Sequence, residues 1–158
     1  MKRFALVLAL ICALTAGFGC AKKQQAEPAP VAYDDGIDNE KNAAVQQITD
    51  GRVYFAFDKY SLLPEGKEVL KNKAELMKRF PSIRVRIEGN CDERGTQEYN
   101  LALGERRAHA AQEFLTTLGV NPSQMETISF GKENPAVQGS GEAVWQQNRR
   151  DDFRVIAQ

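Results

Sequence analysis

Residues 83–89, IRVRIEG, restrict the fold more than any other segment of this 158-residue chain. Isoleucine or valine occupies positions 83, 85 and 87, and arginine or glutamate occupies positions 84, 86 and 88. Because successive side chains of a β-strand point to opposite faces, such a strand has one buried and one solvated face. The alternation therefore predicts a sheet that is covered by helices on one side only.

Two periodicities assign the rest of residues 51–158. Alternating apolar residues predict strands, and apolar residues spaced by three and four predict helices. The predicted elements are a strand at 52–57, a helix at 64–80, the strand at 83–89, a helix at 100–118, a strand at 126–131, a short helix at 141–150 and a strand at 152–157. The order β-α-β-α-β-(α)-β predicts an α+β two-layer sandwich, a mixed sheet with helices on one face.

The N-terminus has the pattern of a bacterial lipoprotein signal. Two basic residues precede an apolar run that is shorter than the roughly 20 residues needed to span a bilayer, as in secretory signal peptides. The run ends in Gly19 and Cys20, which resembles a lipobox, so we expect a signal peptide at 1–19 and acylation of Cys20. Ordinary cleavage without a lipid is the alternative. Ala21 stands where an aspartate would resemble an inner-membrane retention signal, which favours the outer membrane.

Residues 20–50 have the composition of a linker. They are mostly polar, include Pro28 and Pro30, and lack a sustained apolar period. Such segments cannot bury enough apolar surface to fold alone. We therefore expect a flexible tether from Cys20 to residue 50 and a single domain at 51–158.

Composition and charge narrow the range of partners. The chain is 42% hydrophobic and 27% charged, which is a soluble globular balance. Of the 21 basic residues two leave with the signal peptide, so 19 remain against 21 acidic ones. A chain without a basic excess has no electrostatic basis for binding DNA or RNA, and no nucleic-acid partner is expected.

Cys91 is the one cysteine left in the predicted mature domain, because Cys12 belongs to the signal peptide and Cys20 to the lipid site. An intramolecular disulfide is thereby excluded. A lone cysteine at a strand end is more often a small buried apolar residue than a reactive thiol. We expect Cys91 to pack rather than to react.

In the helix predicted at 100–118, two neighbouring arginines lie at different angles to the apolar stripe. At about 100° per residue, Arg106 falls nearly opposite the apolar stripe and faces water, whereas Arg107 falls on the shoulder of the stripe beside Asn100. The stripe consists of Leu101, Gly104, Ala108, Ala111, Leu115 and Leu118. Arg107 is then within reach of Asp92 in the preceding loop. Either the two charges form a structural ion pair, or they hold the carboxylate and the ammonium of one zwitterionic ligand.

Four motifs carry a resemblance that covers the chain from about residue 52 to its end. They are FAFDKYSL at 55–62, IEGNCDERGTQEYNLALGERRA at 87–108, SFGKENPA at 129–136 and NRR at 148–150. In order and spacing they resemble the OmpA C-terminal-like family, in particular its peptidoglycan-associated lipoproteins. The resemblance implies a domain that binds the meso-diaminopimelate side chain of peptidoglycan stem peptides non-covalently.

The resemblance also implies which residues bind this ligand. In the family's motif the aspartate of DERG meets the ligand's amine, and the arginine fifteen positions later meets its carboxylate. Here these are Asp92 and Arg107. Phe57 and Asp58 are implied to contribute contacts largely through their backbone, and Asn100 is a lesser candidate.

The partners implied by the resemblance are peptidoglycan, TolB and other Tol-Pal components, and the outer membrane through the lipid anchor. The implied role is tethering of the outer membrane to the cell wall, in membrane integrity and in cell division. The alternative is a wall-anchoring lipoprotein of another envelope or secretion system, built on the same OmpA-like domain.

Nothing in the sequence favours catalysis. Asp92 and Glu93 are neighbours in a hydrated loop with nothing to shift a pKa, and no Ser-His-Asp or phosphate-loop pattern is present. A metal site needs ligands clustered in space, and the only histidine, His109, falls on the polar flank of its predicted helix, about 130° from the buried stripe. We therefore expect no enzyme, no cofactor and no metal. Trp145 is predicted to be a packing anchor.

Overall fold

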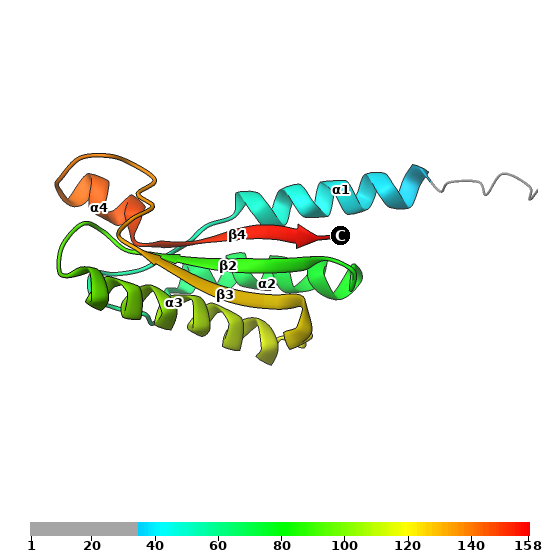
Figure 1. Cartoon of the computed structure of the whole chain (residues 1–158). Coiled ribbons are helices and arrows are strands. Elements are labelled where there is room, and N and C mark those ends of the chain that lie inside the picture. The colour runs from blue at the N-terminus through cyan, green and yellow to red at the C-terminus, as the bar shows by residue number, and fades with distance from the viewer. Residues whose placement is uncertain (1–34) are drawn as a thin grey trace, which may run out of the picture. The chain divides into compact units, whose positions relative to one another are not determined.

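The computed structural model describes residues 35–158, which belong to one compact unit, Asp34–Gln158 (Figure 1). The predicted signal peptide, the lipid site at Cys20 and the linker up to residue 34 lie outside the described residues. Within the described part of the chain, no helix is long and apolar enough to cross a membrane.

The central element is a mixed four-stranded sheet in the order β1-β4-β2-β3. Figure 1 shows β4, β2 and β3 side by side. Its strands are β1 (Val53–Tyr54), β2 (Arg84–Asn90), β3 (Met125–Gly131) and β4 (Arg150–Ala157). Strand β2 runs parallel to β3 and antiparallel to β4, and β4 runs antiparallel to β1. The predicted mixed sheet is therefore confirmed, with β4 inserted between β1 and β2.

Helices α2 (Pro64–Arg79) and α3 (Gln97–Thr117) pack on one face of the sheet. The core includes Leu70, Ala74 and Met77 from α2, Ala108, Ala111 and Leu115 from α3, and Val85, Ile87 and Phe153 from the sheet. The opposite face is polar and carries an ion pair between Arg86 and Glu126. The predicted α+β class, with helices on one face, is confirmed.

Helix α1 (Asp35–Asp50) corrects the predicted domain boundary. The sequence predicts a linker here, but α1 buries Ala44 and Ile48 in the core and packs on β4 and α2. Only these residues and the half-buried Val45 contribute apolar contacts, too few to give a clear helical period. The buried ammonium of Lys73 donates to the carbonyl of Ile48 in the last turn of α1. Tertiary contacts of this kind stabilise most helices, so the domain includes residues 35–50.

Strand β1 is shorter than the predicted 52–57. After Tyr54 the chain leaves the sheet, and the N–H of Lys59 donates to the carbonyl of Ala56 in a turn. Asp58 in this turn has a φ of 57°, a left-handed conformation that aspartate adopts more readily than most residues. The turn presents its backbone carbonyls to the side of α3.

Helix α3 begins at Gln97, three residues earlier than predicted. The side-chain oxygen of Thr96 accepts a hydrogen bond from the N–H of Tyr99 and caps the first turn. Farther along, α3 lies directly against β2, because a Cβ on Gly89 would collide with the carbonyl oxygen of Gly104. This close contact fixes the first half of α3 on the sheet.

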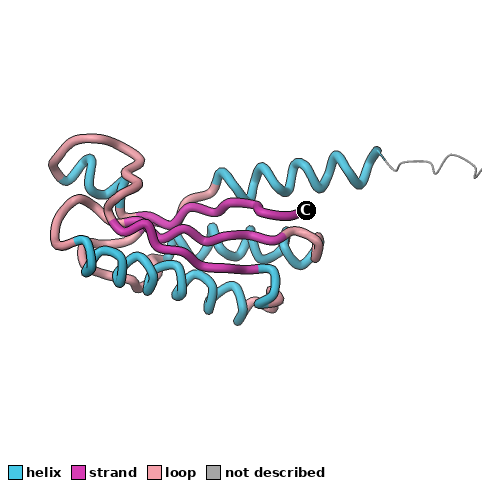
Figure 2. Tube along the Cα trace, viewed as in Figure 1, coloured by secondary structure: helices cyan, strands magenta, loops and turns pink. Residues whose placement is uncertain are grey.

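Loops gather at one end of the sheet (Figure 2). Two of these connections carry predicted site residues, Asp92 after β2 and Phe57 and Asp58 after β1. The loop after β2 leads into α3, and the loop after β3 leads into the short helix α4 (Glu142–Asn148), which precedes β4. Because β2 and β3 are parallel, their carboxyl ends lie at the same edge of the sheet. A 3₁₀ turn (Pro122–Gln124) connects α3 to β3 at the opposite end.

Candidate functional site

A cavity of about 200 Å³ lies between the loop after β2 and the first half of α3. Its lining includes every residue predicted to bind a ligand, Phe57, Asp58, Asp92, Asn100 and Arg107, together with Cys91, Arg94, Gly95, Tyr99 and Leu103. Pockets for drug-sized ligands have roughly 300–1,000 Å³, so this cavity fits a small group such as the end of one side chain. A larger open hollow of about 950 Å³ along α1 and β4 contains none of the predicted residues.

Arg107 is fully buried although it carries a charge. Its Nε donates to the carbonyl oxygen of Lys59 at 2.9 Å, and its Nη1 donates to that of Asn90 at 2.8 Å. Nη2 has only a 3.4 Å contact to the carbonyl oxygen of Ala56. Burial lowers the pKa of Arg107, but a guanidinium stays protonated in proteins. Backbone carbonyls thus hold a cation in place, and Nη2 is its least engaged nitrogen.

The helical spacing of residues 100–118 predicted correctly which of the two arginines of α3 faces water, but it was wrong at one leucine. Arg106 is exposed, as predicted, and Arg107, predicted on the shoulder of the stripe, is fully buried. Leu101, predicted in the buried stripe, is 37% exposed, and Leu103 is buried instead. The first turns of α3 border the cavity rather than the core, which displaces the buried side of the helix there.

The sequence predicts Asp92 in a hydrated loop with nothing to shift its pKa, but Asp92 is almost fully buried and accepts hydrogen bonds on both carboxylate oxygens. Oδ1 accepts from the backbone N–H of Arg94 at 3.2 Å and from its Nε at 3.0 Å. Oδ2 accepts from Nη2 of Arg94 at 2.7 Å and from Nη1 of Arg149 at 3.4 Å. Burial by itself raises the pKa of Asp92, but the hydrogen bonds from the two arginines outweigh it and hold the pKa below its ordinary value. Asp92 is therefore ionised at neutral pH.

Asp92 and Arg107 line the same cavity but do not pair with each other. Among residues 35–158, Asp92 forms ion pairs with Arg94 and Arg149, and Arg107 forms none. The structural ion pair, one of the two interpretations of the sequence, is therefore absent. A cation and an anion border one small cavity while each is held by other groups.

Three further predicted residues form the rim of the cavity. Phe57 is 56% exposed, and the centroid of its ring lies 4.0 Å from the guanidinium carbon of Arg94. Asp58 is exposed and accepts a hydrogen bond from the hydroxyl of Tyr99. Asn100 is buried, and its Nδ2 donates to the carbonyl of Arg94 at 2.7 Å. Asn100 therefore holds the loop in place, whereas Phe57 and Asp58 remain accessible.

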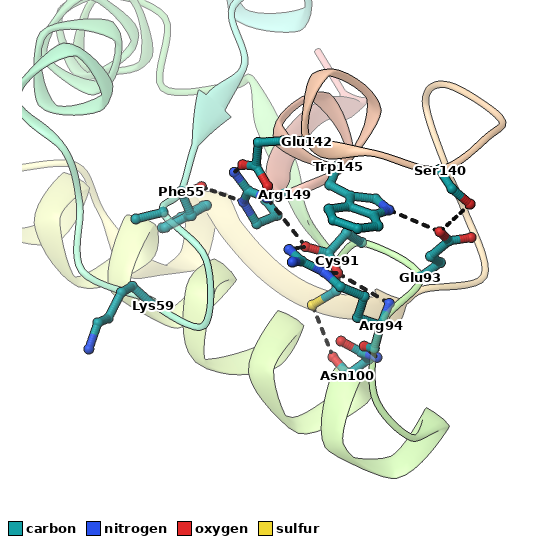
Figure 3. Close-up of polar contacts among 12 residues, drawn as sticks. Phe55, Lys59, Cys91, Glu93, Arg94, Asn100, Ser140, Glu142, Trp145 and Arg149 are labelled. Atoms are coloured by element: carbon teal, nitrogen blue, oxygen red, sulfur yellow. Dashed lines mark hydrogen bonds and ion pairs between the residues drawn. The ribbon is translucent and has the colours of Figure 1, made fainter.

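Arg94 is a central residue of the site that the sequence patterns did not identify. Its guanidinium lies between the rings of Phe57 and Trp145, 4.0 and 3.9 Å from their centroids, and both rings stabilise the cation. Trp145 comes from α4, and its Nε1 donates to Glu93 Oε1 at 2.9 Å (Figure 3). A local signal existed, because an aspartate readily accepts from the N–H two residues later, as Asp92 does here.

Arg149 is a second residue that sequence reasoning missed. It lies directly before β4, is almost fully buried, and donates from Nε to the carbonyl of Phe55 at 3.1 Å. Its Nη2 pairs with Glu142 of α4 at 2.6 Å (Figure 3). Its Nη1 lies 3.4 Å from Oδ2 of Asp92. Arg149 thus connects α4, the end of β1 and the cavity. The NRR motif gave its position but no partner.

Cys91 is buried in the cavity wall, with 3% of its surface exposed. Its Sγ accepts from Nη1 of Arg107 and donates to the carbonyl of Asn100, both at 3.4 Å. Burial raises the pKa of the Cys91 thiol to about 11. The thiol is protonated at neutral pH and is a poor nucleophile, which supports the predicted packing role.

Comparison with known proteins identifies the family of this chain. The sequence pattern of the OmpA family matches residues 54–149. This chain belongs to the OmpA family. The peptidoglycan-associated lipoprotein of Pseudomonas putida is 40% identical over 168 residues, covering 98% of both chains. That of Pseudomonas aeruginosa is 37% identical over 167 residues, also covering 98% of both chains.

Solved structures agree with the OmpA-family fold. The crystal structure of the peptidoglycan-associated lipoprotein from Burkholderia pseudomallei matches with a TM-score of 0.67 and 46% identity, over 69% of this chain and 92% of that chain. The C-terminal domain of Helicobacter pylori MotB matches with a TM-score of 0.63 over 68% of this chain and 85% of that chain. At 18% identity, the second likeness concerns the fold alone.

The OmpA-family match contains the whole lining of the cavity, since it begins in β1 and ends at Arg149. Arg94 and Trp145 also lie within it, whereas α1 precedes it. In the described residues, no group of three or more His, Cys, Asp or Glu side chains is arranged to hold a metal ion. Among the charged groups that line the cavity, the fixed cation of Arg107 and the ionised carboxylate of Asp92 can together bind a small zwitterionic group.

Proposed function

We propose that this protein binds peptidoglycan non-covalently and recognises the meso-diaminopimelate side chain of its stem peptide. The observation that carries the proposal is that Asp92 and Arg107 line one cavity of about 200 Å³ without pairing with each other. Meso-diaminopimelate ends in an ammonium and a carboxylate on one carbon, which complement these two charges. Relatives with 37–40% identity over 98% of both chains carry the name peptidoglycan-associated lipoprotein.

Each end of the zwitterion has a defined partner in this proposal. The ligand carboxylate accepts from Nη2 of Arg107, the nitrogen that has only a 3.4 Å contact to a carbonyl oxygen. The ligand ammonium donates to Asp92, which is ionised at neutral pH. Phe57 and Asp58 border the entrance from the turn after β1. Charge-assisted hydrogen bonds of this kind are roughly twice as strong as neutral ones, so two of them specify the ligand.

The proposed role is binding without catalysis. The one cysteine in residues 35–158 has a buried, protonated thiol, and Asp92 is held by two arginines rather than poised to move a proton. Intact muropeptides incubated with the protein should therefore be recovered unchanged. Release of a shortened muropeptide would contradict this part of the proposal.

The cellular context is also part of the proposal. Acylation of Cys20 would anchor the chain in the outer membrane, and the domain would then tether that membrane to the wall from the periplasm. We assign this tether to the Tol-Pal system, with TolB as a protein partner and a role in membrane integrity and cell division. A tether of another envelope or secretion system is the alternative, and affinity capture of TolB from the same cells distinguishes the two.

Co-sedimentation with purified sacculi tests the proposed ligand. The domain is expected to pellet with sacculi, and free meso-diaminopimelate is expected to return it to the supernatant. An equal concentration of acetate and ammonium, which supplies the same charges on separate molecules, serves as the control and should release little. Sedimentation that is insensitive to meso-diaminopimelate would reject the assignment of the cavity.

A further inference from the structure

Arg94 holds the carboxylate of Asp92 with both arms of its guanidinium. Nε lies 3.0 Å from Oδ1, and Nη2 lies 2.7 Å from Oδ2. Both residues line the cavity, and the proposed function assigns the same carboxylate to the ammonium of a ligand. A carboxylate that already accepts from a two-armed arginine has few lone pairs left for a second cation. The side chain of Arg94 therefore competes with the ligand for Asp92.

The backbone and the side chain of Arg94 are held by different groups. The backbone carbonyl accepts from Asn100 at 2.7 Å, and the backbone N–H donates to Asp92 at 3.2 Å. The guanidinium is held by the ion pair and by the rings of Phe57 and Trp145, and the side chain is 31% exposed. Since the backbone is fixed independently, the side chain can leave Asp92 by rotation about its own bonds. Its departure does not require the loop to move.

Arg149 gives Asp92 a second cation that does not depend on Arg94. Its Nη1 lies 3.4 Å from Oδ2 of Asp92, and the rest of its guanidinium is held by the carbonyl of Phe55 and by Glu142. Asp92 consequently retains one partner when Arg94 leaves, which avoids the cost of a buried carboxylate without a partner. Of the two arginines at Asp92, Arg149 is fixed and Arg94 is exchangeable.

We propose that Arg94 is an exchangeable internal cation that restricts this site to zwitterionic ligands. The inference rests on the proposed function and deepens it. A ligand with an ammonium alone only replaces one cation by another at Asp92. Its binding also breaks the two hydrogen bonds of Arg94 to Asp92 and the stacking of Arg94 on the two aromatic rings. A ligand that also places a carboxylate on Arg107 gains a second charge-assisted contact, which offsets that loss. Discrimination against simple amines is therefore a property of Arg94.

Trp145 reports the position of Arg94 directly. It is the one tryptophan of the chain, and its ring centroid lies 3.9 Å from the guanidinium carbon of Arg94. Displacement of Arg94 removes the stacked cation and changes the surroundings of the indole. Meso-diaminopimelate is expected to shift the tryptophan emission of the wild type. The corresponding diamine without carboxylates, 1,5-diaminopentane, is expected to leave the emission unchanged at the same concentration.

Arg94→Ala tests the competition by calorimetric titration. Without the internal cation, we expect meso-diaminopimelate to bind roughly threefold to tenfold more tightly and 1,5-diaminopentane to bind measurably. Arg106→Ala removes an exposed arginine outside the cavity lining and is the matched control for charge, with wild-type binding expected. Arg94→Lys retains a cation but not the two-armed contact, so its affinity is expected to lie between those of the wild type and Arg94→Ala. It also replaces Arg94→Ala as the test if the alanine variant does not fold.

Three results would overturn the inference. The first is equal or weaker binding of meso-diaminopimelate by Arg94→Ala at an unchanged melting temperature. The second is an unchanged tryptophan emission when the wild type is saturated with meso-diaminopimelate, and the third is wild-type binding of 1,5-diaminopentane as tight as that of the zwitterion. If neither the wild type nor the Arg94 variants bind sacculi or meso-diaminopimelate, the proposed function itself fails. The two failures are therefore distinguishable.

Discussion

Burying a guanidinium without a carboxylate partner is unfavourable, and at Arg107 hydrogen bonds to backbone carbonyls offset part of this free energy. The oxygens of Lys59 and Asn90 accept from Nε and Nη1 at 2.9 and 2.8 Å. A carbonyl dipole offsets only part of a full charge, so the guanidinium keeps its attraction for an anion. An anion at Nη2 would complete the coordination of Arg107, which is why the proposed function gives this residue a binding role rather than a packing role.

The first prediction compares the two adjacent arginines of α3. Arg107→Leu and Asp92→Ala are each expected to weaken sacculus binding by on the order of 2 to 5 kcal/mol, because each leaves one charge of the ligand unmatched in a desolvated site. Arg106→Leu is expected to cost little, since Arg106 is exposed and outside the cavity lining. Co-sedimentation with sacculi measures all three variants.

Thermal unfolding supplies the control for this comparison. Arg107→Leu also leaves the carbonyls of Lys59 and Asn90 without donors, so a lower melting temperature is expected in addition. Binding is therefore measured well below the melting temperature of each variant and corrected for the folded fraction. Equal binding by Arg106→Leu and Arg107→Leu after this correction would reject the assignment of Arg107.

The second prediction concerns Cys91, whose thiol contacts Arg107 and Asn100. Cys91→Ala removes one buried sulfur and is expected to lower the free energy of unfolding by roughly 1 kcal/mol. Sacculus binding is expected to stay within a few-fold of the wild type, because the protonated thiol contributes packing only. Urea unfolding and co-sedimentation check the two expectations. Loss of binding with a stable fold would instead give the thiol a direct role.

At the scale of secondary structure, α1 is the element whose importance is easiest to test. Ile48 is fully buried in the core, whereas Ile37 of the same helix is 56% exposed. Ile48→Ala is expected to lower the free energy of unfolding by about 2 to 4 kcal/mol, and Ile37→Ala by less than about 0.5 kcal/mol. Denaturant unfolding measures both. Equal effects would mean that α1 does not belong to the folded domain.

Lys73 of α2 makes the attachment of α1 sensitive to pH. Its ammonium donates to the carbonyl of Ile48 and lies 4.4 Å from the ring centroid of Phe153. Burial lowers the pKa of Lys73 from 10.5 to about 8, and the charge of Asp50 opposes this only in part. At a pH between these two values, Lys73 is mostly deprotonated in the folded state and mostly protonated in the unfolded state. The free energy of unfolding is therefore expected to rise with pH, by roughly 1 kcal/mol per pH unit.

Urea unfolding at about pH 8 and pH 9 measures this slope. Lys73→Met removes the titrating group and is expected to remove the rise, although its overall stability is lower. The thiol of Cys91 titrates with the opposite sign, because burial raises its pKa from 9.0 to about 11 and favours the protonated folded state. Both proteins are therefore compared in the Cys91→Ala background. If the free energy of unfolding rises equally with pH with and without Lys73→Met, Lys73 is not the group that causes the rise.

The elements differ in how far the sequence determined them. Residues 83–88 alternate strictly, so the strand β2 and its apolar face followed from the pattern alone, whereas the burial of Glu88 on the other face did not. Helix α1 has too few apolar positions for such a pattern and depends on the distant Lys73 and the core. In the site, too, some residues were predictable from the sequence and others were not. The helical spacing and the family resemblance identified Arg107. The contacts of Arg94 with Trp145 depend on tertiary folding, which local periodicity does not describe.

At the scale of the whole molecule, the inclusion of α1 in the domain shortens the segment available as a tether. The sequence predicts a linker up to residue 50, whereas the structure leaves only residues 21–34 between the predicted lipid site and the first described helix. At no more than about 3.6 Å per residue, 14 residues reach at most roughly 50 Å. In the proposed tether, the distance over which the domain would engage the wall is therefore shorter than a linker up to residue 50 would allow.

The last prediction is that Cys20 carries the lipid on which this tether depends. The basic start, the short apolar run and the Gly19-Cys20 pair motivate it, and all three lie outside the described residues. Mass spectrometry of the mature N-terminus is expected to find diacylglycerol on Cys20, and a free cysteine or cleavage at another residue would contradict this. Because one acyl chain binds a membrane only marginally and two bind it stably, Cys20→Ser is expected to move the protein from the membrane to the soluble periplasmic fraction. The released domain should still pellet with sacculi, since its cavity lies wholly within residues 57–107, and loss of both properties together would mean that the substitution impairs export rather than anchoring.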